Sequence, residues 1–414
     1  MTSRQVTVIG AGFSGLSAAY ELNRAGYAVD IVERADRPGG LIATLRTEWG
    51  LVETAASGAL STVRLEALAQ DIGVQLLCPA RTARKRYIYR GAPSRFPLRA
   101  AEWPQFAGFV ARLALNRAAV APRPQESIRA WATRVMGPGA ARYLVEGALQ
   151  GIYSGNPERL SASVILGRFF LERVREPRPR QRGIVAPAGG MGELIAALHD
   201  ALRQRGVAIR TGEAFALDGR PRHPHVIATG AAAAPPLLDQ AAPELAAVLR
   251  SLELNSMITI TAFFREHCIE GFGCLFPPTE RRRALGVLVN TDIFPNRSAQ
   301  YVSETWILGG ADGASALRAA DLLRLSDAEL LDIALGERRS AFGRSGEPAG
   351  YRVTRWPESM PHYSVDLELA LPALERGADN LFLHGNYMGH IGLAKILDRA
   401  AALPPRIEAR GRWS

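Results

Sequence analysis

The pattern of apolar and polar residues over the first forty positions predicts a strand, a helix and a second strand. Residues 6–9 (VTVI) form a short β-branched run, which is too compact for a helix. Uninterrupted apolar runs of this length are typical of parallel strands that are buried on both faces. Good helix formers occupy residues 16–25, Gly26 ends this stretch, and residues 29–32 form the second apolar run.

The turn between the first strand and the helix, residues 10–15 (GAGFSG), has a G-x-G-x-x-G pattern. Gly10 permits a tight turn, Gly12 lets the backbone approach a pyrophosphate, and Gly15 lets the helix lie close to the strand. The helix N-terminus offers N–H groups and a positive dipole end, and Glu33 stands where an acidic residue accepts ribose hydroxyls. The alternative is a unit whose glycines serve packing alone. The predicted dinucleotide contacts are Gly10, Gly12, Phe13, Ser14, Gly15, Glu33 and Arg34.

A second glycine pair distinguishes FAD from NAD. Residues 37–41 (RPGGL), with Thr44 beyond them, resemble the R-x-G-G-x-x-x-T extension of large flavoproteins. That extension lays a second loop along FAD, and NAD enzymes do not need it. We therefore expect FAD, with Gly39, Gly40 and Leu41 among its contacts.

A further glycine-rich turn lies near the C-terminus. Residues 380–383 predict a strand that leads into His384, Gly385 and Asn386, and Gly392 and Leu393 open a helix predicted for residues 393–402, the last in the chain. The dipole at this second helix N-terminus favours the reduced, anionic end of a flavin. A plain terminal α/β unit is the alternative.

The middle of the chain changes character several times. Residues 51–59 predict a strand and a small-residue loop, residues 101–182 are helical, and strands at 208–210 and 225–227 return to the first sheet. Residues 256–264 (SMITITAFF) alternate as an antiparallel strand does, and strands recur to about residue 308. The fold class is α/β: a discontinuous FAD-binding Rossmann-like domain (1–80, 184–254 and 355–414), a mixed-sheet substrate domain (81–98 and 255–354) and a helical region (99–183).

The helix that begins this helical region carries an aromatic-rich face. Trp103, Phe106, Val110, Leu113 and Ala114 recur at helical spacing. Such a face suits an interfacial helix that lies on a membrane. It also suits a helix that packs into the domain's own core, and periodicity leaves both interpretations open.

Composition narrows the partners and the compartment. The 414 residues carry a net charge of +10 and a pI of about 10.0, which favours acidic ligands or anionic surfaces. No helix that would read nucleic acid is apparent, so nucleic acid is not an expected partner. Cys78, Cys268 and Cys274 have neither metal spacing nor a disulfide framework, which fits a reducing compartment and no metal. No signal peptide or transmembrane helix is expected, which indicates a cytoplasmic protein or one peripheral on the cytoplasmic membrane.

Several stretches, taken in order, resemble the protoporphyrinogen oxidase family of the FAD-dependent, amine-oxidase-like superfamily. The most specific is residues 151–161 (GIYSGNPERLS), similar to G-[IV]-[YF]-[AS]-G-[DN]-x-x-x-L-S. The others are residues 271–277 (GFGCLFP), 284–287 (ALGV), 294–297 (FPNR), 308–310 (LGG), 355–357 (RWP) and 360–363 (MPHY). The resemblance therefore covers the chain from residue 5 to about residue 400.

The resemblance implies a function. A porphyrinogen loses hydrogens to FAD over repeated cycles, and oxygen or another acceptor reoxidises the flavin. It also implies that the helical region associates with a membrane. Arg86 would meet a substrate propionate, and Phe272, Leu275, Leu308 and Met360 would line an apolar slot. The alternatives are a solvated surface arginine for Arg86 and ordinary core for the other four. A homodimer is left open.

The chain departs from the family at several places. Ala55 and Ala56 stand where Gly-Pro is usual, His384 replaces a small residue beside the flavin, and Lys395 lies within a replaced Asp-Cys-Ile-like element. These changes leave open whether protoporphyrinogen or coproporphyrinogen is the substrate. Two alternatives remain: another superfamily oxidase acting on an amine or polyene, or a flavin- or porphyrin-binding homologue without turnover. Amine oxidases place a lysine near the flavin, and this chain has only Lys85 and Lys395.

Overall fold

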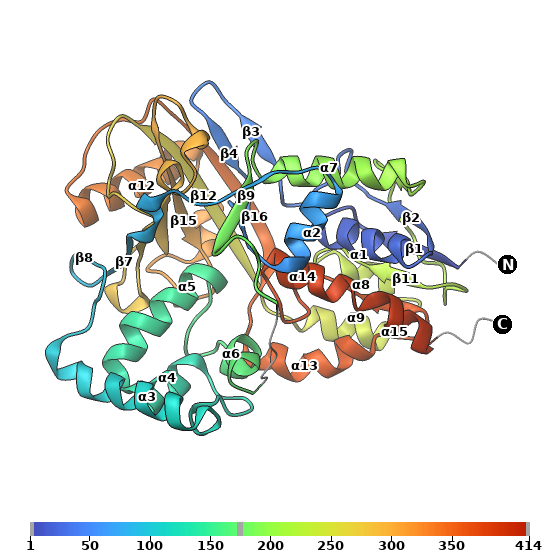
Figure 1. Ribbon diagram of the computed structural model, residues 1–414, viewed down its shortest axis with the longest axis horizontal. Coiled ribbons are helices and arrows are strands. Elements are labelled where there is room, and N and C mark those ends of the chain that lie inside the picture. The colour runs from blue at the N-terminus through green and yellow to red at the C-terminus, as the bar shows by residue number, and fades with distance from the viewer. Residues whose placement is uncertain (1–3, 172–176, 411–414) are drawn as a thin grey trace.

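The computed structural model describes residues 4–171 and 177–410, in which two large sheets stand side by side above a helical region in the view of Figure 1. One sheet has five parallel strands in the order β10-β2-β1-β11-β17. Its strands are β1 (Gln5–Ile9), β2 (Ala28–Val32), β10 (Ala208–Arg210), β11 (His225–Ile227) and β17 (Leu381–Leu383). The chain thus leaves this sheet twice and returns to it, as the apolar runs predict.

Helices cover both faces of the parallel sheet. Val6 and Val8 of β1 pack toward one set of helices, while Ile9 and Ile227 pack toward the other. The first set is α1 (Phe13–Arg24), α2 (Val63–Asp71), α7 (Met191–Gln204), α14 (Leu393–Ala400) and α15 (Leu403–Arg410). The second set is α8 (Ala234–Leu238), α9 (Pro243–Arg250) and α13 (Val365–Arg376).

The helix predicted for residues 393–402 is observed as α14, but it is not the last helix of the chain. Helix α14 ends at Ala400, and α15 begins at Leu403. Pro404 and Pro405 cannot donate the backbone hydrogen bonds that would continue α14. Both prolines are acceptable in the first turn of a new helix, whose N–H groups have no intrahelical partner.

The second large sheet has seven strands in the order β16-β12-β15-β14-β13-β7-β8 and is mixed, because β13 and β7 run parallel while its other pairs are antiparallel. Its strands are β7 (Arg86–Tyr89), β8 (Pro93–Ser94), β12 (Leu254–Phe264), β13 (Gly273–Leu275), β14 (Gly286–Val289), β15 (Val302–Gly309) and β16 (Gly350–Pro361). Helix α12 (Asp327–Phe342) packs on one face over Ile258, Ile260 and Trp306. The opposite face is called the inner face below.

A buried ion pair joins α12 to the mixed sheet. Arg338 Nε lies 3.2 Å from Glu304 Oε2, and both side chains are almost completely buried. Glu304 also accepts from the Cys268 N–H at 2.8 Å and from the Trp306 indole at 3.2 Å. These hydrogen bonds satisfy the carboxylate, as a buried charge requires.

The helical region contains α3 (Trp103–Leu115), α4 (Ile128–Ala140), α5 (Gly147–Tyr153) and α6 (Ala162–Leu171), with a π-helical turn at Ala141–Glu146. The apolar face of α3 is only partly covered: Phe106 and Leu113 pack inward with Phe109, whereas Trp103 and Val110 are 44% and 47% exposed. The apolar residues of α3 extend around more of the helix surface than the packed core of the helical region covers. Within the described residues, no helix has both the length and the apolarity that crossing a membrane requires.

Short elements connect these units. The remaining strands are β3 (Thr44–Arg46), β4 (Leu51–Glu53), β5 (Ala59–Leu60), β6 (Leu76–Leu77) and β9 (Ile184–Pro187). The remaining helices are α10 (Asn290–Ile293), α11 (Ala319–Leu322) and 3-10 turns at Arg81–Arg84, Ala100–Glu102, Arg117–Val120, Pro278–Glu280 and Pro295–Arg297.

Candidate functional site

The G-x-G-x-x-G turn lies at the carboxyl edge of the parallel sheet, where open α/β sheets bind ligands. Gly10 has a φ of +101°, which favours glycine, and its N–H donates to the Val32 carbonyl at 2.8 Å. A Cβ at Gly15 would lie 1.8 Å from the Gly10 carbonyl oxygen, so only glycine lets α1 approach the strand this closely. Gly12 precedes α1 in an extended conformation.

The second glycine loop lies directly against this turn. The Gly39 N–H donates to the Ala11 carbonyl at 2.8 Å, and a Cβ at Gly40 would lie 3.2 Å from the Gly12 Cα. Leu41 beyond them is 37% exposed. The two sequence motifs therefore form one continuous backbone surface.

Glu33 joins the same surface from the end of β2. Its carboxylate accepts the Ala11 N–H at 2.6 Å and the Ala35 N–H at 2.8 Å. The side chain thus lies over the glycine turn and remains partly accessible, whereas Arg34 is exposed. Glu33 is placed where it can accept further hydroxyl donors.

The helices around this edge differ in how their N-termini are satisfied. The first turn of α7 is capped from the β3–β4 hairpin: Met191 N–H donates to Glu53 at 3.0 Å and Gly192 N–H donates to Thr44 at 2.9 Å. Helices α1 and α14 have glycines before their first residue, no side-chain cap and no acidic residue in the first turn. Their N-termini remain open to an anionic ligand.

The turn after β17 contributes the remaining predicted contacts. The Asn386 side chain donates to the Ser359 carbonyl at 3.4 Å, and the Asn386 carbonyl accepts from the Tyr363 hydroxyl. Gly385 is buried beside the Tyr387 ring, which a Cβ would approach to 2.7 Å. Gly392 is exposed and Leu393 is half-buried at the start of α14.

Two enclosed polar atoms at this edge have no partner in the described part of the chain. They are Thr229 Oγ1, just after β11, and His384 Nε2, just after β17. Burial, with Arg399 and Arg406 nearby, lowers the pKa of His384 to about 3, so the imidazole is neutral. Open helix N-termini, a glycine cradle and unpartnered polar atoms on adjacent strands fit an FAD phosphate and ribityl chain.

Side chains from the mixed sheet and its connecting turns bind the segment around β4, next to the glycine loops. The Trp356 indole N–H donates to the Thr54 carbonyl at 2.7 Å, and Arg297 lies 3.4 Å from Glu53. Burial raises the pKa of Glu53, although the Thr44 hydroxyl and Arg297 oppose this. The small-residue segment after β4 therefore lies next to the inner face.

The residues of the inner face follow from strand register. They alternate with the residues packed under α12 and pair with one another across the strands. They are Thr259, Thr261, Leu275, Leu288, Ser303, Thr305, Ile307 and Thr354.

The predicted substrate residues separate in the structure. Arg86 is exposed and lies 4.3 Å from the centre of the Phe272 ring, and Leu275 lies nearby on the inner face, beneath Gly151 of α5. Leu308 lies on the other face, in the core under α12. Met360 lies on β16, where it pairs with Asn255 of β12. Four strands separate β16 from β7, which carries Arg86, so at ordinary strand spacing these two strands lie roughly 24 Å apart.

Sequence reasoning missed the hydroxyl side of the inner face. The signal is the alternation itself, because in residues 257–261 (MITIT) the isoleucines pack under α12 and the threonines face the opposite way. The period of two in β15 likewise places Thr305 and Ile307 on the inner face and Trp306 and Leu308 on the outer one.

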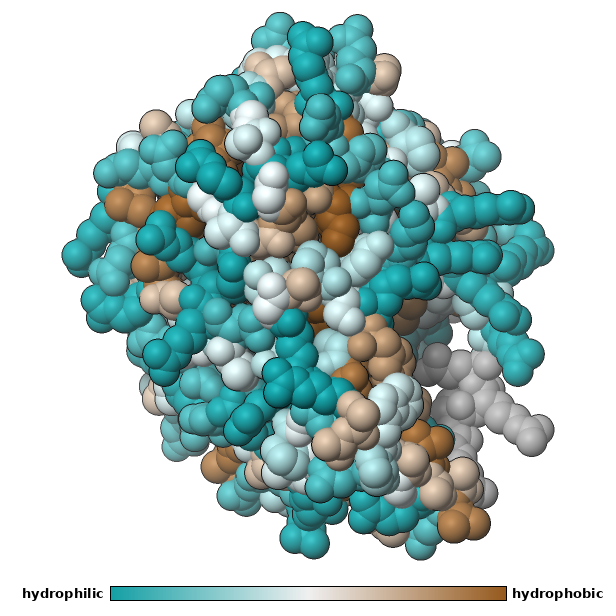
Figure 2. Space-filling model, turned by 90° about the vertical axis from the view of Figure 1, so that its left-hand side faces the viewer, coloured by the Kyte–Doolittle hydropathy of each residue, from teal (hydrophilic) through white to brown (hydrophobic). Residues whose placement is uncertain are grey.

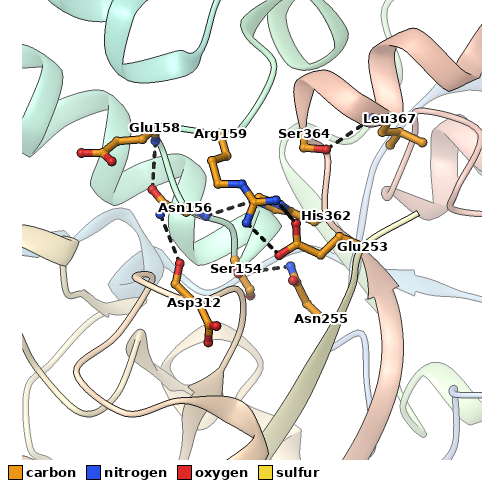
Figure 3. A network of polar contacts seen from close by, with 10 residues as sticks. All are labelled: Ser154, Asn156, Glu158, Arg159, Glu253, Asn255, Asp312, His362, Ser364 and Leu367. Carbon is orange, nitrogen blue, oxygen red and sulfur yellow. Dashed lines mark hydrogen bonds and ion pairs between the residues drawn. The ribbon is translucent and has the colours of Figure 1, made fainter. Parts of the chain in front are cut away.

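The G-I-Y-S-G motif leads into a polar junction, shown in Figure 3. His362 accepts the Asn156 N–H at 3.2 Å through Nε2, and its Nδ1 lies 3.0 Å from Glu253. Arg159 also donates to Glu253, and Asn255 donates to the Ser154 carbonyl at 3.3 Å. This motif therefore anchors the helical region to β12 and to the end of β16.

Comparisons with known proteins agree with this geometry. Residues 13–216 match the model of the flavin-containing amine oxidoreductases. The chain is 26% identical to the mitochondrial protoporphyrinogen oxidase of Nicotiana tabacum over 96% of this chain and 93% of that protein. It is 27% identical to protoporphyrinogen oxidase of Homo sapiens over 74% of this chain and 78% of that protein.

Solved structures share the fold. A provisionally named protoporphyrinogen oxidase of Exiguobacterium sp. 255-15 superimposes with a TM-score of 0.77 at 20% identity, covering 99% of this chain and 100% of that one. Putrescine oxidase superimposes with a TM-score of 0.72 at 14% identity over 99% of both chains. From its glycine cradle, its architecture and these relatives, the chain is an FAD-dependent oxidoreductase that is similar to the flavin-containing amine oxidoreductases and, among them, to the protoporphyrinogen oxidases.

Proposed function

We propose that this enzyme oxidises a porphyrinogen, protoporphyrinogen or coproporphyrinogen, to the porphyrin, with oxygen or another acceptor taking the electrons. The observation that carries the proposal is the composition of the inner face. Leu288, Thr305, Ile307 and Thr259 bring no carboxylate, imidazole or amine to its centre. A reaction driven by gain of aromaticity needs positioning more than acid–base groups, and this face suits it.

Bound FAD supplies the electron sink for this chemistry. The chain's own contribution is to hold the macrocycle on the inner face, with Leu288 and Ile307 excluding water from its apolar surface. Arg86, exposed beside Phe272, reaches a propionate at the periphery. A guanidinium binds a carboxylate in a bidentate manner, so this contact also fixes the in-plane orientation of the ring.

The test is an assay of the FAD-loaded protein with each porphyrinogen. Porphyrin fluorescence should appear faster than in spontaneous oxidation, and a Gly12→Val variant without FAD should match the spontaneous rate. Protein that holds FAD but accelerates neither oxidation would overturn the proposal and favour a binding protein without turnover.

The positions of the lysines weigh against amine oxidation. Lys85 pairs with Glu270 at 2.9 Å on the surface, and Lys395 pairs with Asp398 at 3.2 Å on α14. Neither belongs to the inner face. Putrescine and other amines should therefore leave the flavin oxidised under anaerobic conditions, while a porphyrinogen should bleach it.

We further propose that the helical region binds a membrane surface. Phe96 and Trp103 stack at 5.0 Å and are 51% and 44% exposed, and Leu115 at the other end of α3 is 87% exposed. Figure 2 shows apolar side chains at the lower end of the molecule, where this region lies, among others elsewhere on the same face. Sedimentation with phosphatidylglycerol vesicles should capture the protein, and Trp103→Glu should weaken capture. No capture would overturn this part.

A further inference from the structure

Two hydroxyls of the inner face hold Asn290. It begins α10 directly after β14, and its Nδ2 donates to Ser303 Oγ at 3.0 Å and to Thr305 Oγ1 at 2.8 Å. Thr305 Oγ1 in turn lies 2.8 Å from the buried Thr261 Oγ1. In this orientation both N–H groups of the amide are occupied by hydroxyl oxygens.

The side-chain carbonyl oxygen of Asn290 accepts no hydrogen bond from the described residues. Asn290 Oδ1 has no hydrogen-bond partner within residues 4–171 and 177–410, and it is not among the enclosed unpartnered atoms. Because the side chain is only half-buried, this oxygen remains accessible. A ligand that covers Asn290 Oδ1 without offering a hydrogen-bond donor leaves this oxygen unsatisfied. The oxygen therefore favours ligands that bring an N–H group.

We propose that Asn290 Oδ1 accepts a hydrogen bond from an inner pyrrole N–H of the bound porphyrinogen and so sets the position of the macrocycle on the inner face. This inference rests on the proposed function. All pyrrole nitrogens of a porphyrinogen carry hydrogen, so the ring centre holds donors and no acceptor for them. A neutral amide oxygen suits these donors, since burial of a carboxylate in its place would cost desolvation energy.

The same contact discriminates substrate from product. The porphyrin keeps only part of the inner N–H groups, and its remaining ring nitrogens are acceptors that repel an amide oxygen. Asn290 therefore binds the porphyrinogen more tightly than the porphyrin and favours product release. Ser303 and Thr305 are positioning residues, because they act through the amide.

The direct test is Asn290→Leu, with Asn380→Leu as a matched control, since the Asn380 amide bonds the Pro221 carbonyl away from the inner face. In the FAD-loaded enzyme, Asn290→Leu should raise the KM for the porphyrinogen about five- to tenfold, the value of one hydrogen bond. It should change kcat less and leave the dissociation constant of FAD unchanged. The control should change neither kinetic parameter.

A second pair of variants separates positioning from packing. Thr305→Val keeps the shape and removes the hydroxyl, whereas Thr305→Ser keeps the hydroxyl. Thr305→Val should raise the KM for the porphyrinogen and narrow the difference between its affinities for porphyrinogen and porphyrin. Thr305→Ser should keep the wild-type KM and the wild-type difference. An active wild type with unchanged kinetics in Asn290→Leu and Thr305→Val overturns the inference alone. A wild type that oxidises no porphyrinogen overturns the proposed function and this inference with it.

Discussion

The Trp356 indole donates its N–H to the Thr54 carbonyl oxygen at 2.7 Å, which joins the edge strand of the mixed sheet to the segment that follows β4. Trp356 comes from β16, and Thr54 is fixed in turn because its hydroxyl donates to the Leu41 carbonyl at 2.7 Å. The hydrogen bond therefore couples the inner face to the second glycine loop.

Trp356→Phe should lower the free energy of unfolding by about 1 kcal/mol, because it removes one partner of a part-buried hydrogen bond while keeping most of the apolar contact. Urea denaturation of the FAD-loaded protein measures this change. Trp103→Phe is the control, since Trp103 is 44% exposed, and it should be close to neutral. Equal stabilities of the two variants would contradict the coupling.

Gly12→Val should abolish FAD binding while leaving the fold intact. A Cβ at Gly12 meets no heavy atom closer than 3.9 Å, so the protein tolerates a side chain that a pyrophosphate does not. Circular dichroism and thermal unfolding without cofactor check the fold, and flavin absorbance after gel filtration checks binding. Full retention of FAD would show that the pyrophosphate lies elsewhere.

Gly15→Ala should behave differently, because its Cβ would lie 1.8 Å from the Gly10 carbonyl oxygen. Thermal unfolding should show that it destabilises the protein even without FAD. Gly108→Ala on the surface of α3, where nothing lies within 4 Å, should stabilise it slightly.

Stability should fall in mild acid because of His384. Its folded-state pKa of about 3 is well below the ordinary value of 6.5, so the unfolded chain binds a proton that the folded chain does not. The stabilisation that comes from neutral His384 is fully present above about pH 6.5. It is lost as the pH falls toward 3, and the free energy of unfolding drops by up to about 1.4 kcal/mol per pH unit. His384→Leu should flatten the pH dependence of the free energy of unfolding between pH 6.5 and 5. An unchanged slope would contradict the assignment.

Arg86→Ala should raise the KM for a porphyrinogen that bears propionates more than it lowers kcat, because the arginine contacts a group remote from the reacting carbon. Steady-state kinetics with Arg86→Lys and Arg250→Ala provide the comparison. Lysine should recover part of the affinity, and the Arg250 change on α9 should have no effect. A KM unaffected by Arg86→Ala would remove Arg86 from the binding site.

The parts of the fold that depend on local sequence are predictable. Buried strands, glycine turns and helix starts leave contiguous signals, which is why the expected positions of β1, α1, β10 and β12 lie close to the observed ones. The two glycine loops are predictable for the same reason, since each motif serves a backbone requirement. Domain limits and oligomeric state stay predictions.

The substrate face is harder to predict because it depends on register. A shift of one residue moves a side chain to the other face of a strand, and Leu308 lies under α12 while its neighbour Ile307 lies on the inner face. The role of Asn290 depends on hydroxyls from another strand, so no local pattern reveals it. The helix break before α15, by contrast, has a local signal in Pro404 and Pro405.

The placement of β17 beside β11 has a consequence for biosynthesis. β17 follows β11 in the chain only after α8, α9, most of the mixed sheet and α13, so β11 keeps an open edge while that long stretch is being synthesised. Unpaired edges of this kind attract other chains. Newly made protein should therefore depend on chaperones until β17 has been synthesised, and deletions that remove β17 should aggregate rather than yield a shortened flavoprotein.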